Sequence, residues 1–169
     1  MVIKIKRIKR IAVAVKDLNK AVETYKKLFG IEPFAHGIEA EDKYEWMAFK
    51  VGEGDCTMEF LAPYNDPKGE VLIGKFIRER GEGLYMVTFE TEGSPEEVRA
   101  QMKETGIKPA WNGRMKQWTD GKDFAVWTEN YVHPRDACGV LITLASIQYP
   151  KPKIEEYKPG KTLPPPEEE

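Results

Sequence analysis

The chain of 169 residues is long enough to bury a hydrophobic core, so one compact domain is the default expectation. Its 26 basic and 28 acidic residues leave a formal net charge of -2, which argues against a general attraction to nucleic acid. Two cysteines, Cys56 and Cys138, are too few for a disulfide framework and predict free thiols. The apolar run at 11–15 is too short for a signal peptide or a membrane span, so we expect a cytoplasmic protein without membrane contact.

Residues 10–31 predict a strand, a capped helix and a glycine stop. Asp17 is placed to cap the first amides of the helix, and Gly30 can adopt the left-handed conformation that ends it. Apolar residues recur at helical spacing between them. The strand is indicated by β-branched residues that alternate with alanine: Ile11, Val13 and Val15.

A second copy of this pattern follows later in the chain. Residues 87–89 predict its strand, and Ser94 and Glu97 form a capping box around a proline at the first helical position. The same spacing separates three matched pairs: Val22 and Val98, Gly30 and Gly106, Ile31 and Ile107. We therefore predict two copies of one strand–helix module.

The rest of the chain supplies strands and connections. Residues 32–42 predict a polar connection and 111–122 a loop. The segment 151–169 is rich in Pro, Lys and Glu and has too little apolar content for a core, so we expect a disordered or surface-lying tail. The other expected elements are strands over 45–51, 57–62, 124–128 and 140–145, and a helix over 71–78.

A strand–helix unit followed by antiparallel strands, present twice, predicts an α+β domain over 1–150. Module one would span about 8–65, a connecting helix about 70–80, and module two about 84–149. Each half would offer a curved mixed sheet, and the two sheets would meet around a cleft.

Four stretches carry a resemblance to a known family: Arg-Ile-Ala-Val-Ala-Val-Lys-Asp-Leu at 10–18, Met-Glu-Phe-Leu-Ala-Pro at 58–63, and the segments 75–84 and 133–142. Together they resemble the vicinal oxygen chelate, or glyoxalase-like, superfamily of paired βαβββ modules, and within it the methylmalonyl-CoA epimerases. The resemblance runs from about 8 to 149 in the family's order. It implies that the protein forms a homodimer.

The resemblance also implies a divalent metal that polarises a carbonyl group and stabilises an enolate. Carried over by position, its ligands fall on Arg10, Glu59, Met86 and Thr143. Only Glu59 suits a hard cation, because arginine is not a practical ligand and the sulfur of methionine is soft. The chain has only two histidines, His36 and His133, as replacements. We therefore predict no metal site and no other cofactor.

If the fold is that of the family, Arg10 and Glu59 project into one cleft. Two readings stay open. In the structural reading the two side chains satisfy one another and preserve the scaffold, as buried charges require. In the functional reading Arg10 replaces the charge of the metal and binds a carboxylate or thioester oxygen, and Glu59 acts as a general base.

Five other residues are candidate ligand contacts. The aromatic side chains of Tyr85, Trp46 and Trp127 could wall the cleft or simply pack in the core. His133 and Arg135 lie in the turn that the epimerase-like motif places beside its substrate, or else form an ordinary surface turn around a proline.

The function implied is that of a metal-free relative of the epimerases. It would bind a small carboxylate or an acyl-CoA thioester between its modules and, if catalytic, move a proton next to a carbonyl as an epimerase, isomerase or lyase. Two alternatives from other classes are a non-catalytic small-molecule binding protein and an accessory subunit that docks through its tail.

Overall fold

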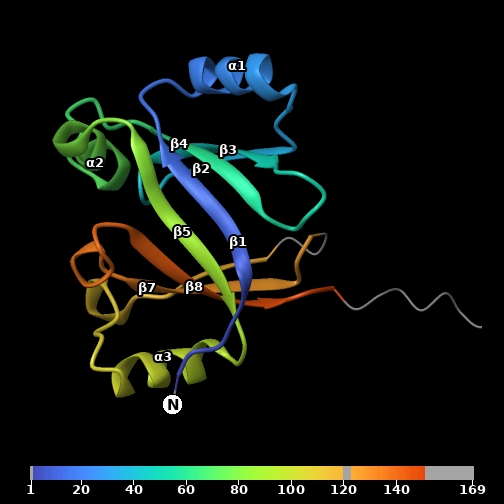
Figure 1. The fold of residues 1–169 in the computed structure, drawn as a ribbon. Helices are drawn as coiled ribbons and strands as arrows, with labels where there is room; N and C mark the ends of the chain where they lie inside the picture. The colour runs from blue at the N-terminus through green and yellow to red at the C-terminus, as the bar shows by residue number, and fades with distance from the viewer. Residues whose placement is uncertain (1, 120–122, 151–169) are drawn as a thin grey trace, which may run out of the picture.

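The computed structural model describes residues 2–119 and 123–150, and the predicted tail at 151–169 lies outside them. One mixed sheet organises the described chain, with the strand order β2-β3-β4-β1-β5-β8-β7-β6 (Figure 1). In chain order the elements of the first half are β1 (Ile5–Ala14), α1 (Leu18–Phe29), β2 (Ala35–Glu39), β3 (Tyr44–Lys50), β4 (Thr57–Pro63) and α2 (Leu72–Arg80). Those of the second half are β5 (Gly83–Thr91), α3 (Pro95–Glu104), the 3-10 turn η1 (Trp111–Gly113), β6 (Lys116–Trp118), β7 (Val126–Val132), the 3-10 turn η2 (Pro134–Asp136) and β8 (Leu141–Gln148).

The same strand–helix–three-strand order occurs twice, with α2 between the copies. β1 and β5 pair antiparallel at the centre, and each pairs in parallel with the last strand of its own half, β4 or β8. The sheet curls so that one face is enclosed. The predicted α+β glyoxalase-like fold of two βαβββ modules is therefore confirmed, with the two curved halves joined into one sheet.

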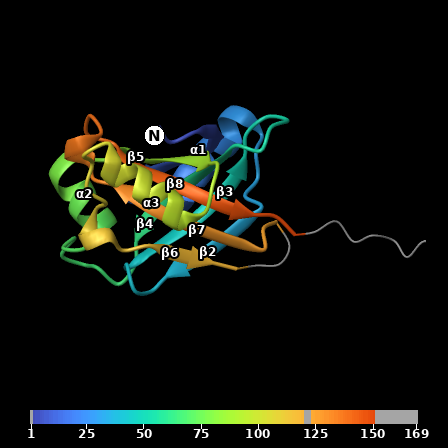
Figure 2. The same ribbon diagram turned by 90° about the horizontal axis from the view of Figure 1, so that it is seen from below.

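Helices cover the outer face of each half. α1 packs on β3 and β4 through a cluster that includes Leu18, Phe49 and Phe60. α3 lies across β7 and β8, as Figure 2 shows from below, through Val98 and Met102. Because both outer faces are filled in this way, the inward faces of the central strands are left to form the site.

Both helix starts follow the sequence prediction. The Asp17 carboxylate accepts a hydrogen bond from the Lys20 amide, and Gly30 ends α1 in the left-handed region at a φ of 65°. Ser94 and Glu97 form the reciprocal capping box of α3. The described residues contain no helix long and apolar enough to cross a membrane.

Two predicted connections contain strands instead. The polar connection over 32–42 includes β2, and the loop over 111–122 includes η1 and β6. Both strands are short edge strands with few apolar residues, so their alternation does not stand out in the sequence. The structure gives a reason for the glycine in β2, because a Cβ at position 37 would lie 2.7 Å from the Trp46 ring of the paired strand β3.

We predict that Asp17→Ala lowers the free energy of unfolding by about 1 kcal/mol, because it leaves the first amides of α1 without an acceptor. Urea denaturation measures this loss. Asp17→Asn keeps a side-chain oxygen at the same place and is the control, with an expected loss of only a few tenths of a kcal/mol. Equal losses in the two variants would contradict the capping role.

Candidate functional site

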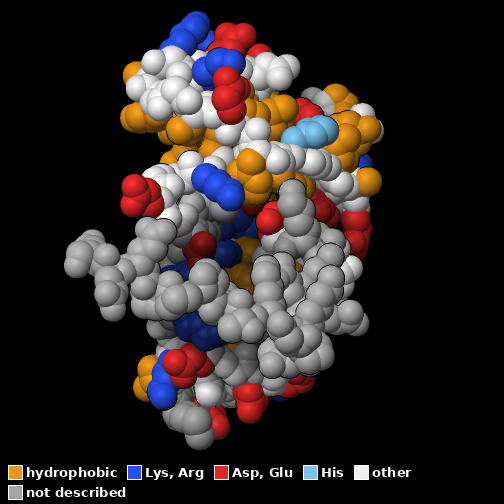
Figure 3. All heavy atoms as spheres, turned by 90° about the vertical axis from the view of Figure 1, so that its right-hand side faces the viewer, with side chains coloured by type: hydrophobic (Ala, Val, Ile, Leu, Met, Phe, Trp, Pro, Cys, Tyr) orange, Lys and Arg blue, Asp and Glu red, His pale blue; other side chains and the backbone are white. Residues whose placement is uncertain are grey.

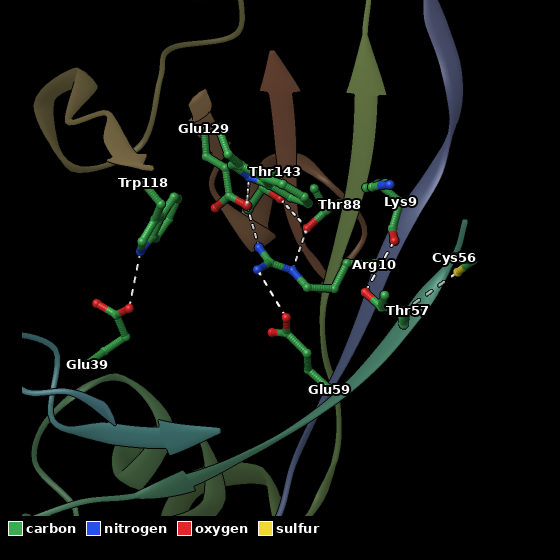
Figure 4. Close-up of polar contacts among 11 residues, drawn as sticks. Lys9, Arg10, Glu39, Cys56, Thr57, Glu59, Thr88, Trp118, Glu129 and Thr143 are labelled. Carbon is green, nitrogen blue, oxygen red and sulfur yellow. Dashed lines mark hydrogen bonds and ion pairs between the residues drawn. The ribbon is translucent and has the colours of Figure 1, made fainter. Parts of the chain in front are cut away.

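A largely buried arginine, with a side chain that is 13% exposed, lies at the centre of the enclosed face. Arg10, on β1, donates from Nε to Thr88 Oγ1 at 3.1 Å and from Nη1 to Glu59 Oε1 at 3.4 Å. Its Nη2 atom donates to Glu129 Oε1. Figure 4 shows the guanidinium between the two carboxylates, with Glu59 reaching it from β4 and Glu129 from the opposite half of the sheet. We call Arg10, Glu59, Glu129 and Thr88 the Arg10 network.

A tryptophan holds the second carboxylate in place. Trp127, two residues before Glu129 on β7, donates from Nε1 to Glu129 Oε1 at 2.9 Å. Its ring also faces the Arg10 guanidinium, with Cζ 5.3 Å from the ring centroid. The side chain of Glu129 is only 1% exposed, so its charge is stabilised by these contacts and not by water.

Strand register explains why these residues meet. Arg10 lies opposite Thr88 in the β1–β5 pair, and Thr88 lies opposite Thr143 in the β5–β8 pair. Thr143 Oγ1 donates to Thr88 Oγ1 at 2.6 Å, so the two hydroxyls extend the network across three strands. Three of the four positions that the resemblance assigns to metal ligands therefore lie in or beside one polar cluster. The fourth, Met86, packs in the apolar core below it.

The network holds one guanidinium and two carboxylates. Burial raises the pKa of Glu59, and the nearby Glu129 adds to the rise, while Arg10 opposes it. Burial alone would lower the pKa of Arg10, but attraction to Glu129 and Glu59 outweighs it and raises that pKa. The folded chain thus holds a proton on Glu59 more tightly than the unfolded chain does. The protonated Glu59 carboxyl group therefore adds to the stability of the fold at low pH. This added stability is lost as pH rises through the folded pKa of Glu59.

The residues present do not fit the divalent metal that the fold family implies. The Arg10 guanidinium stands at the first ligand position and is already bonded to the only carboxylate among the four positions. A guanidinium cannot donate an electron pair to a cation. The described part of the chain also contains no cluster of three or more His, Cys, Asp or Glu side chains arranged to hold a metal ion.

Two cavities adjoin the network, and Arg10, Tyr44 and Trp118 line both of them. The first, of about 270 Å³, lies beside the start of α2, and we call it the α2 cavity. The second, of about 600 Å³, is lined by Trp46, Glu59 and other residues, and we call it the Trp46 cavity. Figure 3 shows a hollow in the surface between the two halves of the molecule, with basic and acidic side chains inside it.

Side chains bridge the two edges of the sheet across these cavities. Lys116 on β6 pairs with Glu39 on β2, at 3.0 Å, and with Asp42 just beyond it. Trp118 Nε1 donates to Glu39 Oε1 at 3.1 Å, as Figure 4 shows, and Arg114 pairs with Asp42 at 3.2 Å. Within 2–119 and 123–150, β2 and β6 lie at opposite ends of the strand order and form no backbone ladder with one another, so these side-chain contacts bridge them.

The predicted site residues lie in the Arg10 network, along the two cavities and at the η2 turn. Arg10 and Glu59 meet as expected. Trp46 and Trp127 line the Trp46 cavity, and Tyr85 lines the α2 cavity, where burial raises its pKa to about 12. His133 and Arg135 do not line either cavity. Arg135 lies in η2 and His133 precedes it as the cap, where His133 Nδ1 accepts from the Arg135 amide, as in an ordinary capped turn.

Glu129 is the residue that the sequence analysis missed. The predicted strand ended at 128, but β7 continues through Val132. The alternation of Trp127, Glu129 and Tyr131 places all three on the same face of that strand, and this alternation was the available signal. Ala12, Ala14 and Ala145 on the central strands are fully buried and fill space by close packing.

Comparison with known proteins agrees with this architecture. A profile of the glyoxalase/bleomycin resistance protein/dioxygenase superfamily matches residues 9–126. A sequence search of curated proteins finds no significant match.

Three solved structures illustrate the likeness in fold. A methylmalonyl-CoA epimerase in complex with methylmalonyl-CoA and NH4+ superposes with a TM-score of 0.71 at 21% identity, covering 87% of this chain and 100% of that one. A variant of the Streptomyces coelicolor epimerase in complex with 2-nitronate-propionyl-CoA gives 0.70 at 22%, with coverages of 85% and 98%. The Mycobacterium tuberculosis epimerase gives 0.67 at 23%, with coverages of 88% and 91%.

We predict that Arg10→Met lowers the free energy of unfolding near neutral pH by about 3–5 kcal/mol, because it leaves the buried carboxylate of Glu129 and the largely buried carboxylate of Glu59 without a counter-charge. Denaturant unfolding at a series of pH values measures the loss. It should shrink as pH falls, since a carboxyl group with a raised pKa takes up its proton more readily in the folded chain.

The matched control for this prediction is the triple variant Arg10→Met, Glu59→Gln, Glu129→Gln, which removes all three charges together. We expect it to recover most of the lost stability, because no uncompensated charge remains. A loss in Arg10→Met that is below about 1 kcal/mol, or that does not depend on pH, would show that the network is not the main constraint at this site.

Proposed function

Because this chain belongs to the glyoxalase/bleomycin resistance protein/dioxygenase superfamily, we propose that it binds an acyl thioester or related carbonyl compound beside Arg10. We further propose that it moves a proton at the carbon next to that carbonyl, without a metal. The reaction would be of the epimerase, isomerase or lyase type. The likeness in fold to proteins crystallised with acyl-CoA compounds supports this ligand class.

The observation that carries the proposal is the convergence of Arg10 and Glu59 at one cavity wall. A guanidinium has five N–H donors, and the hydrogen bonds of Arg10 within the network engage three of its nitrogen atoms once each. The remaining donors on Nη1 and Nη2 are available to a carbonyl oxygen. Both residues line the Trp46 cavity, so a ligand there can contact them together.

The chemistry follows from these two groups. Ionised Glu59 removes a proton from the carbon next to the carbonyl, the C–H bond breaks, and its electron pair moves to the carbonyl oxygen to form an enolate. Arg10 stabilises that oxygen by charge and hydrogen bonding. The same proton, or one from solvent after exchange, then returns to the carbon. A carboxyl group whose pKa is raised by burial is a stronger base when ionised, which suits this role.

The second candidate function is non-catalytic binding of the same ligand. The pairing of Arg10 with two carboxylates favours it, because a fully paired network satisfies its own charges and can persist for stability alone. The two candidates differ in one measurable respect, which is whether Glu59 exchanges a proton with the ligand.

We predict that the protein accelerates deuterium uptake from D2O at the α-carbon of at least one thioester among propionyl-CoA, methylmalonyl-CoA and phenylacetyl-CoA, as measured by mass spectrometry. Glu59→Gln should slow this uptake by about 10²-fold or more, because it removes the base. Glu23→Gln, on the exposed face of α1, is the matched control and should not change it.

Two results would contradict the proposal. Binding of these thioesters without any exchange above the buffer rate would favour the non-catalytic function. Exchange that is equal in Glu59→Gln and in the unaltered protein would remove Glu59 as the base.

We also propose, from the family resemblance, that the protein is a cytoplasmic homodimer. Light scattering of the full chain should give twice the mass of one 19.3 kDa chain. A mass that stays at one chain across the concentration range would contradict the dimer.

A further inference from the structure

The α2 cavity has an apolar wall. Apolar side chains from β4, β5, β8 and the start of α2 contribute to it, among them Leu61, Ile73 and Leu141. Aromatic rings complete it, including Tyr85 and Trp111. Its volume of about 270 Å³ corresponds to roughly nine groups of the size of a water molecule at ~30 Å³ each.

The charged side chains that line the α2 cavity already have partners of opposite charge. Arg10 pairs with Glu129 and Glu59. Lys116 pairs with Asp42 and Glu39, and Arg114 pairs with Asp42 and Glu41. An anionic ligand group in this cavity would have to compete with carboxylates that are held in place, and its burial without a free cation would be costly.

The Trp46 cavity differs from the α2 cavity in the pairing of its positively charged side chains. Lys9 and Lys50 line it, and neither forms an ion pair with a carboxylate among the described residues. Each ammonium group lies over an aromatic ring, Lys9 at 5.4 Å from the Tyr149 centroid and Lys50 at 5.6 Å from that of Phe34.

Five carboxylates also line this cavity: Glu39, Glu53, Asp55, Glu59 and Asp123. Three of them already have cationic partners, because Glu39 pairs with Lys116, Asp55 with Arg7 and Glu59 with Arg10. The two lysine ammonium groups are therefore the cations of this lining that can meet anionic groups such as phosphates.

Backbone strain marks the rim of the α2 cavity. Leu72 and Trp111 both line it and both adopt positive φ angles, of 34° and 48°. Such a conformation costs about 1–3 kcal/mol in a residue other than glycine and concentrates at functional sites. The strain therefore supports a ligand-binding role for this cavity over incidental loose packing.

The start of α2, in contrast, favours an acyl group that carries a negative charge. Val71, the residue before α2, gives the helix no side-chain cap, and a helix start attracts negative charge. An acyl group with its own carboxylate, as in methylmalonyl-CoA, is therefore the alternative to test. The pairing of Arg10, Arg114 and Lys116 outweighs it, because full charges interact more strongly than the partial charge of a helix end.

The geometry points to a two-part ligand: an acyl thioester whose neutral, bulky apolar acyl group occupies the α2 cavity while its anionic carrier lies in the Trp46 cavity. Its carbonyl group lies at Arg10, which both cavities share. This inference rests on the proposed function and narrows its substrate class. An aromatic acyl group of the size of phenylacetyl fits the volume of the α2 cavity.

Calorimetric titration of the full chain with phenylacetyl-CoA, methylmalonyl-CoA, acetyl-CoA and free CoA tests the inference. Phenylacetyl-CoA should bind about 10-fold or more tightly than each of the other three, since only its ring gains from burial in the apolar cavity. Methylmalonyl-CoA that binds as tightly or more tightly would overturn this inference and leave the proposed function intact. If none of the three thioesters binds, the inference and the proposed function fail together.

Variants test whether the α2 cavity is the place of binding. Val71→Trp places a larger side chain at its rim and should remove the preference for phenylacetyl-CoA over acetyl-CoA. Tyr85→Trp, in the same wall, is a second variant in case the first does not fold. Val51→Trp, at an exposed position outside both linings, is the control and should keep the preference. A preference that survives in a folded α2-cavity variant would overturn the assignment.

Discussion

The ion pairing of Arg10 is the constraint on which the rest of the enclosed face depends. Its guanidinium, on a central strand, receives one carboxylate from the first half of the sheet and one from the second. A buried charge is tolerated only when its partners are held in good geometry, so the two halves must keep a fixed distance and twist around this side chain. Thr88 and Trp127 fix that geometry further, because Thr88 bonds Arg10 from the neighbouring strand β5 and Trp127 bonds Glu129 from two residues away on β7. Arg10 also lines both cavities, so this arrangement contributes to the wall of each.

The same network carries an unequal balance of charge, and this has opposite consequences for stability and reactivity. Two carboxylates share one guanidinium, and burial raises the pKa of Glu59. A fully compensated cluster would be more stable, but it would contain no carboxyl group with a raised pKa to take up and return a proton. Functional sites commonly retain such a cost in stability. An imbalance that is placed at a cavity wall, and not deep in the core, is what the proposed proton transfer requires.

Much of the fold could be predicted from the sequence, because its main signals are local and independent. The cap at Asp17, the stop at Gly30 and the capping box at Ser94 each act within one helical turn, and they recur in the same order. The short edge strands β2 and β6 carry no such signal, since their pairing is decided by neighbours distant in the chain. The meeting of Arg10 and Glu59 followed from placing both on the known fold. Glu129 could not be inferred in the same way, because its role depends on a strand that extends four residues beyond its predicted end and on the ring of Trp127 beneath the guanidinium.

An arginine at the first ligand position changes what the enclosed face can do chemically. A divalent metal offers two positive charges and open coordination positions, whereas Arg10 offers one charge that two carboxylates already offset. Its stabilisation of a developing oxyanion must therefore come mainly from directed N–H donors in a site that excludes water. Such a site gives less electrophilic assistance than a metal, so it suits ligands whose own α-proton is comparatively acidic. An arylacetyl group such as phenylacetyl provides that acidity, because its ring is bonded to the α-carbon and delocalises the enolate, and the apolar α2 cavity beside Arg10 provides the space for the ring. On the proposed chemistry, the replacement of the metal ligands and the apolar character of this cavity thus favour the same class of substrate, a thioester with an aromatic ring next to its acidic α-proton.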